Sequence, residues 1–501
     1  MDHDEYAAHD ALGLAELVRA GEVTSDELVA AARRRMAEVN GRINAVVVDV
    51  DPPATSASSV SSGSSSAGGT DAPFAGVPFL VKDLHQDVAG YPTSGGSRSL
   101  ATTVATENAD VVQRWLDAGL VVLGKTNTPE FGAKGITESE LFGPARNPWN
   151  TDHTPGGSSG GAAAAVAAGI VPAAGASDGG GSIRIPASAC GLFGLKATRG
   201  LVPSGPAHGE PLGGTATDGV ISRSVRDSAA MLDVLVGSAS YSPYLPAMPP
   251  TSYADEVGQD PGVLRIGLCT ASSINPSPDP EAVAAAVATA TLLESLGHHV
   301  EHLDAAPFDD AALAKDFLTS WFVYCAYSVA EAKRASGSGD SGFEDDTLTM
   351  AALGRATSPV EFVRAVENRH THVRRLAQFH ERFDLLLTPT TATPPPRVGA
   401  FDPPRAVRLA QRALLTARAA SVLRLTPIVD QMISENLGWV PYTQLANLTG
   451  RPAVTVPLHW TAAGLPIGSQ LVGRLGADGL LLRLAAQLEA AAPWADRRPS
   501  L

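Results

Sequence analysis

A lysine and two serines in glycine-rich surroundings are the residues of this sequence that are best suited to catalysis. Lys82 ends an apolar segment, Ser158 lies within the run Gly156–Gly161, and Ser182 directly follows the three glycines 179–181. Such a set could carry out acyl transfer, in which a serine hydroxyl attacks a carbonyl carbon while a base accepts its proton. The sequence therefore predicts nucleophilic catalysis.

The neighbours of each candidate suit it to that chemistry. A lysine at the end of a buried apolar strand is hard to charge, so its pKa would fall from an ordinary ~10.4 toward neutrality and leave an amine base. Three consecutive glycines before Ser182 allow positive φ angles, and their N–H groups can converge on a developing oxyanion, where one donor is worth ~3 kcal/mol. Ser158 opens an alanine-rich helix, whose N-terminal partial positive charge favours an alkoxide.

Alternating strand and helix patterns surround these segments and predict an α/β fold with a largely mixed or parallel sheet. Strands are expected at 43–50, 76–83, 264–269, 300–303, 384–387, 452–457 and 467–472. Helices are expected at 24–39, 280–296 and 480–491, and they dominate 309–382. Between them, the Ser/Gly-rich stretch 51–73 is too poor in apolar residues to pack and is expected to be a flexible surface loop. Residues 236–262, which are rich in proline, are expected to form a connector.

Taken together and in order, the motifs resemble the amidase signature family of serine amidohydrolases. The matching stretches are Gly76–Asp83, Gly124–Phe131, Asn147–Asn150, Gly156–Gly161, Ser177–Pro186, Gly194–Lys196, Arg223–Asp227 and Leu465–Gly468. The resemblance implies one amidase signature domain over residues 1–501, an α/β/α fold with a twisted mixed sheet covered by helices. Its core motifs would lie at about 74–235 and its substrate-wall helices at about 305–450.

The resemblance also implies a Ser–cis-Ser–Lys triad. Ser182 matches the nucleophile, Ser158 the bridging serine on a cis peptide bond after Gly157, and Lys82 the base. Backbone N–H groups would form the oxyanion hole, from Gly179, Gly180, Gly181 and Ser182. The implied reaction is amide hydrolysis through an acyl-enzyme, without a metal or an organic cofactor.

Three further expectations follow from the same resemblance. Asp178 and Arg184 flank the nucleophile where the family has a supporting ion pair. Position 179 often carries a larger residue in the family, so Gly179 is expected to widen the pocket. The end of the chain, 487–499, is similar to the 6-aminohexanoate cyclic-dimer hydrolase branch, as is 147–150, which implies small amides, cyclic amides or ω-amino-acid amides as substrates.

Composition limits the partners. The formal charge of −15 argues against a nucleic-acid partner, because such binding draws its affinity from clustered Lys and Arg. The apolar run 162–176 is interrupted by glycine and proline and is shorter than the ~20 residues that a bilayer requires. Three cysteines form no C-x-x-C pair, and Cys190 is expected to be a buried thiol. With an acidic N-terminus that lacks a signal peptide, we expect a cytoplasmic protein with no membrane partner. Its expected partner is a small-molecule amide substrate, and a homodimer is a candidate assembly.

Two motifs compete with this interpretation. Residues 119–126 match the P-loop expression letter for letter, but their middle residues form a strand pattern instead of the loop that a phosphate requires. Residues 156–160 match the G-x-S-x-G elbow of an α/β-hydrolase esterase, with Ser158 as nucleophile and His459 as its partner. That alternative leaves the glycine run before Ser182 unexplained. The histidines 298, 299 and 302 suggest a solvated turn more than a metal site.

Two other functions share the same residues. One is the amidase subunit of a glutamine-dependent tRNA amidotransferase, which would use the triad inside a larger assembly. The other is a binding protein on an inactive amidase scaffold, against which the intact Lys82, Ser158 and Ser182 argue. The acidic balance of the chain favours a free-standing hydrolase.

Overall fold

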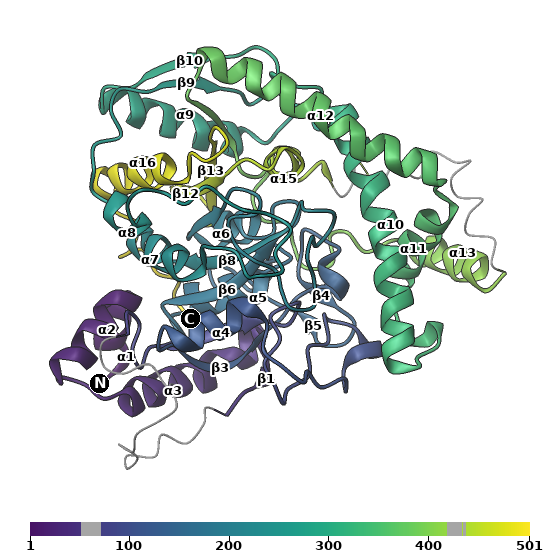
Figure 1. Ribbon diagram of the computed structural model, residues 1–501, viewed down its shortest axis with the longest axis horizontal. Helices are drawn as coiled ribbons and strands as arrows, with labels where there is room; N and C mark the ends of the chain where they lie inside the picture. The colour runs from purple at the N-terminus through teal and green to yellow at the C-terminus, as the bar shows by residue number, and fades with distance from the viewer. Residues whose placement is uncertain (52–71, 418–432, 434–436) are drawn as a thin grey trace.

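A mixed sheet of eleven strands forms the centre of the computed structural model, which describes residues 1–51, 72–417, 433 and 437–501 (Figure 1). The strand order is β1-β3-β2-β6-β8-β7-β12-β13-β11-β9-β10. The strands are β1 Val46–Asp49, β2 Pro78–Lys82, β3 Val121–Thr126, β6 Ala173–Asp178, β7 Phe193–Lys196, β8 Thr217–Ser222, β9 Arg265–Leu268, β10 His299–His302, β11 Leu385–Pro389, β12 Ala453–Trp460 and β13 Pro466–Val472. A separate pair joins β4 Glu138–Ser139 to β5 Gly143–Pro144. The predicted α/β class is confirmed.

Helices cover this sheet. They are α1 His3–Ala8, α2 Ala11–Ala20, α3 Ser25–Ile43, α4 Asp110–Asp117, α5 Gly160–Ala167, α6 Arg184–Cys190, α7 Val225–Leu235, α8 Tyr253–Glu256, α9 Pro280–Ser295, α10 Asp310–Ser336, α11 Asp345–Ala356, α12 Pro359–Arg382, α13 Arg405–Thr416, α15 Gln444–Thr449 and α16 Asp478–Ala491. Successive residues of β13 show that α9 and α6 lie on opposite faces, since side chains alternate along a strand. Ser469 bonds to Thr289 of α9, whereas Gln470 bonds to Arg184 of α6.

The parallel pairing of β2 with β6 brings the catalytic candidates together. Both strands run in the same direction, so their carboxyl ends meet at one edge of the sheet. Lys82 is the last residue of β2 and Asp178 the last residue of β6. The glycine run and Ser182 follow β6 directly, and they therefore enter the same region as the lysine.

The first helical region differs from its expected boundaries. Helix α3 begins within one residue of its expected start at 24, after a capping box between Thr24 and Glu27, but continues past the expected end at 39 to Ile43. Asn44 ends the helix in a left-handed conformation with φ 47°. The side-chain oxygen of Asn40 accepts the next two N–H groups, so the chain turns later and β1 is shorter than predicted.

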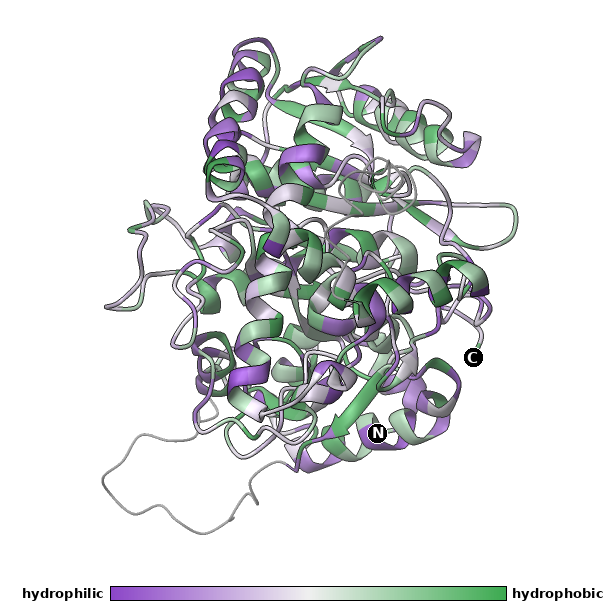
Figure 2. Ribbon diagram, turned by 90° about the vertical axis from the view of Figure 1, so that its right-hand side faces the viewer, coloured by the Kyte–Doolittle hydropathy of each residue, from purple (hydrophilic) through white to green (hydrophobic). Residues whose placement is uncertain are grey.

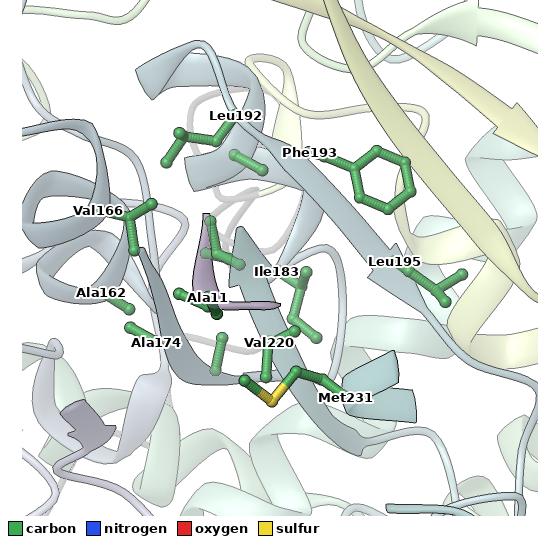
Figure 3. Close-up of a cluster of buried hydrophobic side chains, with 14 of the residues drawn as sticks. Ala11, Ala162, Val166, Ala174, Ile183, Leu192, Phe193, Leu195, Val220 and Met231 are labelled. Carbon is green, nitrogen blue, oxygen red and sulfur yellow. The ribbon is translucent and has the colours of Figure 1, made fainter. Parts of the chain in front are cut away.

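The apolar run after Ser158 is the buried core of the fold. Every residue of α5 is buried, and β6 continues the same packing (Figure 3). Figure 2 shows this hydrophobic interior beneath outer helices of mixed polarity. Within the described ranges, no helix has the length and apolar character needed to cross a membrane.

Two expected irregular segments have different outcomes. Of the predicted flexible loop at 51–73, residues 52–71 lie outside the described residues. The expected connector at 236–262 is irregular apart from the short helix α8.

Helix α5 allows a test of this packing. A methyl group on Gly161 would lie 2.4 Å from the Asn127 nitrogen and 2.6 Å from the Ala45 carbonyl oxygen, both of which are main-chain atoms. We expect Gly161→Ala to lower the free energy of unfolding by ~3 kcal/mol, because overpacked backbone cannot yield easily. The matched control is Gly41→Ala in α3, which has open space and should be stabilising by up to ~1 kcal/mol. Urea unfolding measures both; equal effects would contradict the packing account.

Candidate active site

The buried amine of Lys82 contacts two serine hydroxyls. Its Nζ lies 2.7 Å from Ser158 Oγ and 3.1 Å from Ser177 Oγ. Lys82 is fully buried at the end of β2, and this burial lowers the pKa of its ammonium to about 7. The nearby carboxylates of Asp218 and Asp178 oppose that shift. The lysine can therefore be a neutral base near neutral pH.

Glycines allow Ser158 to approach this lysine. The Gly157–Ser158 peptide bond is cis, and a side chain on Gly157 would lie 2.5 Å from the carbonyl oxygen of Ile136. Ser159 occupies the N-cap position of α5 but makes no cap hydrogen bond there. Its hydroxyl instead donates to the Ser177 carbonyl at 3.2 Å, which ties the helix start to β6.

Ser182 lies beside this pair. The Ser159 N–H donates to the Ser182 carbonyl at 3.3 Å, and the Ser182 side chain is 8% exposed. Within the described residues, the hydroxyl groups of Ser158 and Ser182 make no hydrogen bond to each other. The contact between Lys82 and Ser158 is thus formed, and Ser182 lies next to it through the main-chain bond to Ser159.

Asp178 and Arg184 form a fully buried, bidentate ion pair beneath Ser182. Arg184 Nε and Nη2 lie 2.9 and 3.0 Å from the two Asp178 oxygens. Burial tends to raise the pKa of the Asp178 carboxyl, but the Arg184 charge and hydrogen bonds outweigh it and hold this pKa far below its usual range. The carboxylate also accepts the N–H groups of Gly181 at 2.6 Å and Ile183 at 3.2 Å.

The hydrogen bond from Gly181 to Asp178 corrects one expectation for the oxyanion hole. The Gly181 N–H points to Asp178, so it is not available for a substrate oxygen. By contrast, the N–H groups of Gly179, Gly180 and Ser182 make no hydrogen bond within the described residues. The glycine run is held from the other side by Thr443, whose hydroxyl donates to the Gly180 carbonyl at 2.7 Å.

The space beside the glycine run is filled, contrary to the expected wider pocket. A Cβ on Gly179 would lie 2.7 Å from Leu212 Cδ1 and 3.6 Å from the Trp321 ring, and one on Gly180 would lie 2.7 Å from Phe317. Phe317 and Trp321 stack on α10 with ring centroids 5.2 Å apart. Leu212 has φ 52°, a strained conformation for a bulky residue. The missing side chains therefore admit an apolar wall close to the N–H groups of Gly179 and Gly180.

Two other buried lysines lack such serine partners. Lys125, from the P-loop-like segment, ends in contact with Thr93, and its segment forms the buried strand β3 as predicted. Lys196 donates to the Ala197 carbonyl at 2.6 Å, and burial lowers its pKa to about 7. A lowered lysine pKa alone therefore does not distinguish Lys82 from Lys196, whereas the contact with the serines does.

The competing histidine and cysteine candidates have structural contacts. His459 lies on β12 and pairs with Glu281 of α9 at 2.7 Å. His298 is buried, not solvated as expected, because it accepts the Leu264 N–H and contacts Gln487. Cys190 is fully buried, which raises the pKa of its thiol. Among the described residues, no group of three His, Cys, Asp or Glu side chains could hold a metal ion.

Several supporting residues escaped the sequence interpretation. Asn447 of α15 donates to both the main chain and the carboxylate of Asp178, and it accepts from Arg184 at 2.6 Å. Gln470 of β13 also contacts Arg184. A polar side chain inside an otherwise apolar strand was the available signal for Gln470, but its partner in another part of the chain was not visible.

The fold and the site together define an amidase. The Amidase family model matches residues 27–482, and the chain belongs to this family, whose members hydrolyse C–N amide bonds. The chain is 36% identical to a 6-aminohexanoate-cyclic-dimer hydrolase of Pseudomonas sp. (strain NK87), over 98% of this chain and 96% of that one.

Solved structures agree with this family. The 6-aminohexanoate cyclic dimer hydrolase complexed with substrate is 33% identical with a TM-score of 0.87, covering 99% of each chain. A bacterial aryl acylamidase of the amidase signature family is 27% identical with a TM-score of 0.81, covering 97% of each chain. The chain is therefore a hydrolase that acts on amide bonds.

The buried ion pair generates a stability prediction. Arg184→Met leaves the Asp178 carboxylate buried without its cation, and we expect a loss of ~3–5 kcal/mol in the free energy of unfolding. Adding Asp178→Asn should recover part of this loss. The matched control is Arg382→Met, whose exposed ion pair with Glu301 should be worth less than ~1 kcal/mol. Urea unfolding would contradict the account if both arginine variants lost the same amount.

Proposed function

We propose that this amidase hydrolyses small, uncharged carboxylic amides, linear or cyclic, through an acyl-enzyme on Ser182. The observation that carries the proposal is the 2.7 Å contact between the buried Lys82 amine and Ser158, at the sheet edge where Ser182 also lies. A neutral amine in contact with a hydroxyl can accept its proton, and the hydroxyl can in turn accept one from a second serine.

The proposed reaction proceeds in two halves. Ser158 gives its proton to Lys82 and takes the proton of Ser182, whose oxygen attacks the amide carbonyl carbon. The resulting oxyanion accepts hydrogen bonds from the N–H groups of Gly179, Gly180 and Ser182. The proton returns through Ser158 to the leaving nitrogen, and the C–N bond breaks. Water then attacks the acyl-enzyme by the same relay and releases the acid.

The walls of the site favour an apolar substrate. Leu212, Phe317 and Trp321 border the glycine run, and the pair Asp178–Arg184 is closed off by its own contacts. A charged acyl group placed against such a wall would lose its hydration without gaining a partner. The names of the relatives add small cyclic amides of aminohexanoate as candidates. The finer expectations of a cytoplasmic location and a homodimer remain predictions.

The amidotransferase alternative is less favoured, because the two relatives compared above are named as a cyclic-dimer hydrolase and an aryl acylamidase. The Gly156–Gly160 elbow is also less favoured as a nucleophile site. Ser158 faces a lysine, and His459 is paired with Glu281 instead. Esters with the same acyl groups should react, since the relay does not require an amine leaving group.

An amide panel tests the proposal. We expect the purified chain to release ammonia from hexanamide and benzamide, and to act far more slowly on succinamate, whose carboxylate meets the apolar wall. Ser182→Ala should lower kcat on hexanamide by about five to six orders of magnitude, as expected when a nucleophile is removed. Ser295→Ala, at the exposed end of α9, is the matched control and should retain wild-type turnover. Full activity of Ser182→Ala would exclude Ser182 as the nucleophile.

The lysine gives the reaction a defined pH dependence. Because Lys82 must be neutral to accept a proton and its pKa is lowered to about 7, kcat/KM for hexanamide should rise as pH increases through about 7. Below that range the ammonium form dominates and activity falls about tenfold per pH unit. Lys82→Met should abolish this limb together with most turnover. A rate that stayed constant across the range would exclude Lys82 as the base.

A further inference from the structure

Two buried carboxylates lie on opposite sides of the end of β6. Asp178 ends the strand and is neutralised by Arg184. Asp218, on the neighbouring antiparallel strand β8, lies directly opposite Ser177. Residues opposite each other in an antiparallel pair project to the same face of the sheet. Ser177 contacts the Lys82 amine on that face, so Asp218 belongs to the lysine side.

Gln86 connects Asp218 to the lysine. The Gln86 Nε2 donates to Asp218 Oδ1 at 2.9 Å and to the Ala176 carbonyl at 3.1 Å. The Gln86 Oε1 accepts the main-chain N–H of Lys82 at 2.6 Å. Gln86 is fully buried and Asp218 is 7% exposed. The bridge therefore fixes the turn that leaves β2 against β6 and β8.

Asp218 is also a charge that the lysine experiences. In the described part of the chain it makes no ion pair, whereas Asp178 is saturated by Arg184. Burial raises the pKa of Asp218 to about 6, against the Gln86 hydrogen bond and the Lys82 charge, which lower it. The same carboxylate raises the pKa of Lys82 more than Asp178 does.

Other titratable groups face this pair from the surrounding elements. Asp87, after β2, acts on Asp218 and raises its pKa. His85, on the same turn, stacks edge-on against His208 with ring centroids 4.6 Å apart. Neither makes a hydrogen bond to Lys82 within the described residues. Of the carboxylates that raise the pKa of Lys82, Asp218 therefore has the largest effect.

We propose that Asp218 is a positioning residue for Lys82, which holds the lysine turn through Gln86 and sets the pH range in which the amine is neutral. The inference rests on the proposed function of Lys82 as the base. Its sign follows from electrostatics: removing a nearby negative charge destabilises the ammonium form and lowers the pKa of the lysine.

The experiment compares pH profiles of kcat/KM on hexanamide. In Asp218→Asn the acid limb should move to lower pH by about half to one unit, so this variant outperforms the wild type below neutrality. Asp218→Glu, which keeps the charge, should restore the limb toward the wild-type position. The matched control is Asp233→Asn on α7, a carboxylate whose hydrogen-bond donors are the Tyr253 and Ala254 N–H groups at the start of α8 and, among the described residues, include neither Lys82 nor Gln86; the limb of this variant should not move.

A second neutral variant, Asp218→Ala, separates charge from shape. Both neutral variants should shift the limb in the same direction, even if Asp218→Ala loses more thermal stability. An unchanged limb, an upward shift, or failure of both neutral variants to fold would overturn the inference. A wild-type enzyme that hydrolyses no amide would instead overturn the proposed function, so the two failures are distinguishable.

Discussion

The contact between one buried amine and one serine hydroxyl is the interaction on which the rest of the site depends. Water would keep the Lys82 amine protonated, so a neutral amine needs an enclosure, and an enclosed amine needs polar partners. The hydroxyl groups of Ser158 and Ser177 supply those partners and carry no charge. The strand β2 and the alanine-rich helix α5, in which every residue is buried, provide the enclosure.

Sheet direction then decides which charges reach the amine. Because β2 and β6 are parallel, Lys82 and the segment that contains Ser182 arrive at one edge of the sheet. Because side chains alternate along each strand and Asp218 lies opposite Ser177, Asp218 and Asp178 project to opposite faces of the sheet at that edge. Asp178 faces Arg184 on one side, and Asp218 faces the lysine side on the other. Two acids one strand apart thereby serve different tasks, one structural and one electrostatic.

Sequence patterns predicted the α/β class, the strand that ends at Lys82 and the helix after Ser158, because each depends on a short apolar run. The pairing of Asp178 with Arg184 was implied by the family resemblance and not by a local signal. The contributions of Asn447 and Gln470 could not be predicted, since they reach Arg184 from distant segments. Nor could the filling of the space beside Gly179 by Leu212, which depends on a loop in a strained conformation.

The hydrogen bond from Gly181 to Asp178 has a thermodynamic consequence. Three successive glycines have more backbone freedom than any other tripeptide, and a donor array built from them would ordinarily have to be ordered by each arriving ligand. Here the carboxylate and the Thr443 hydroxyl anchor the run before anything binds. The conformational entropy of the run is already lost on folding, so an arriving ligand does not have to order these residues, and that part of the cost of binding is removed.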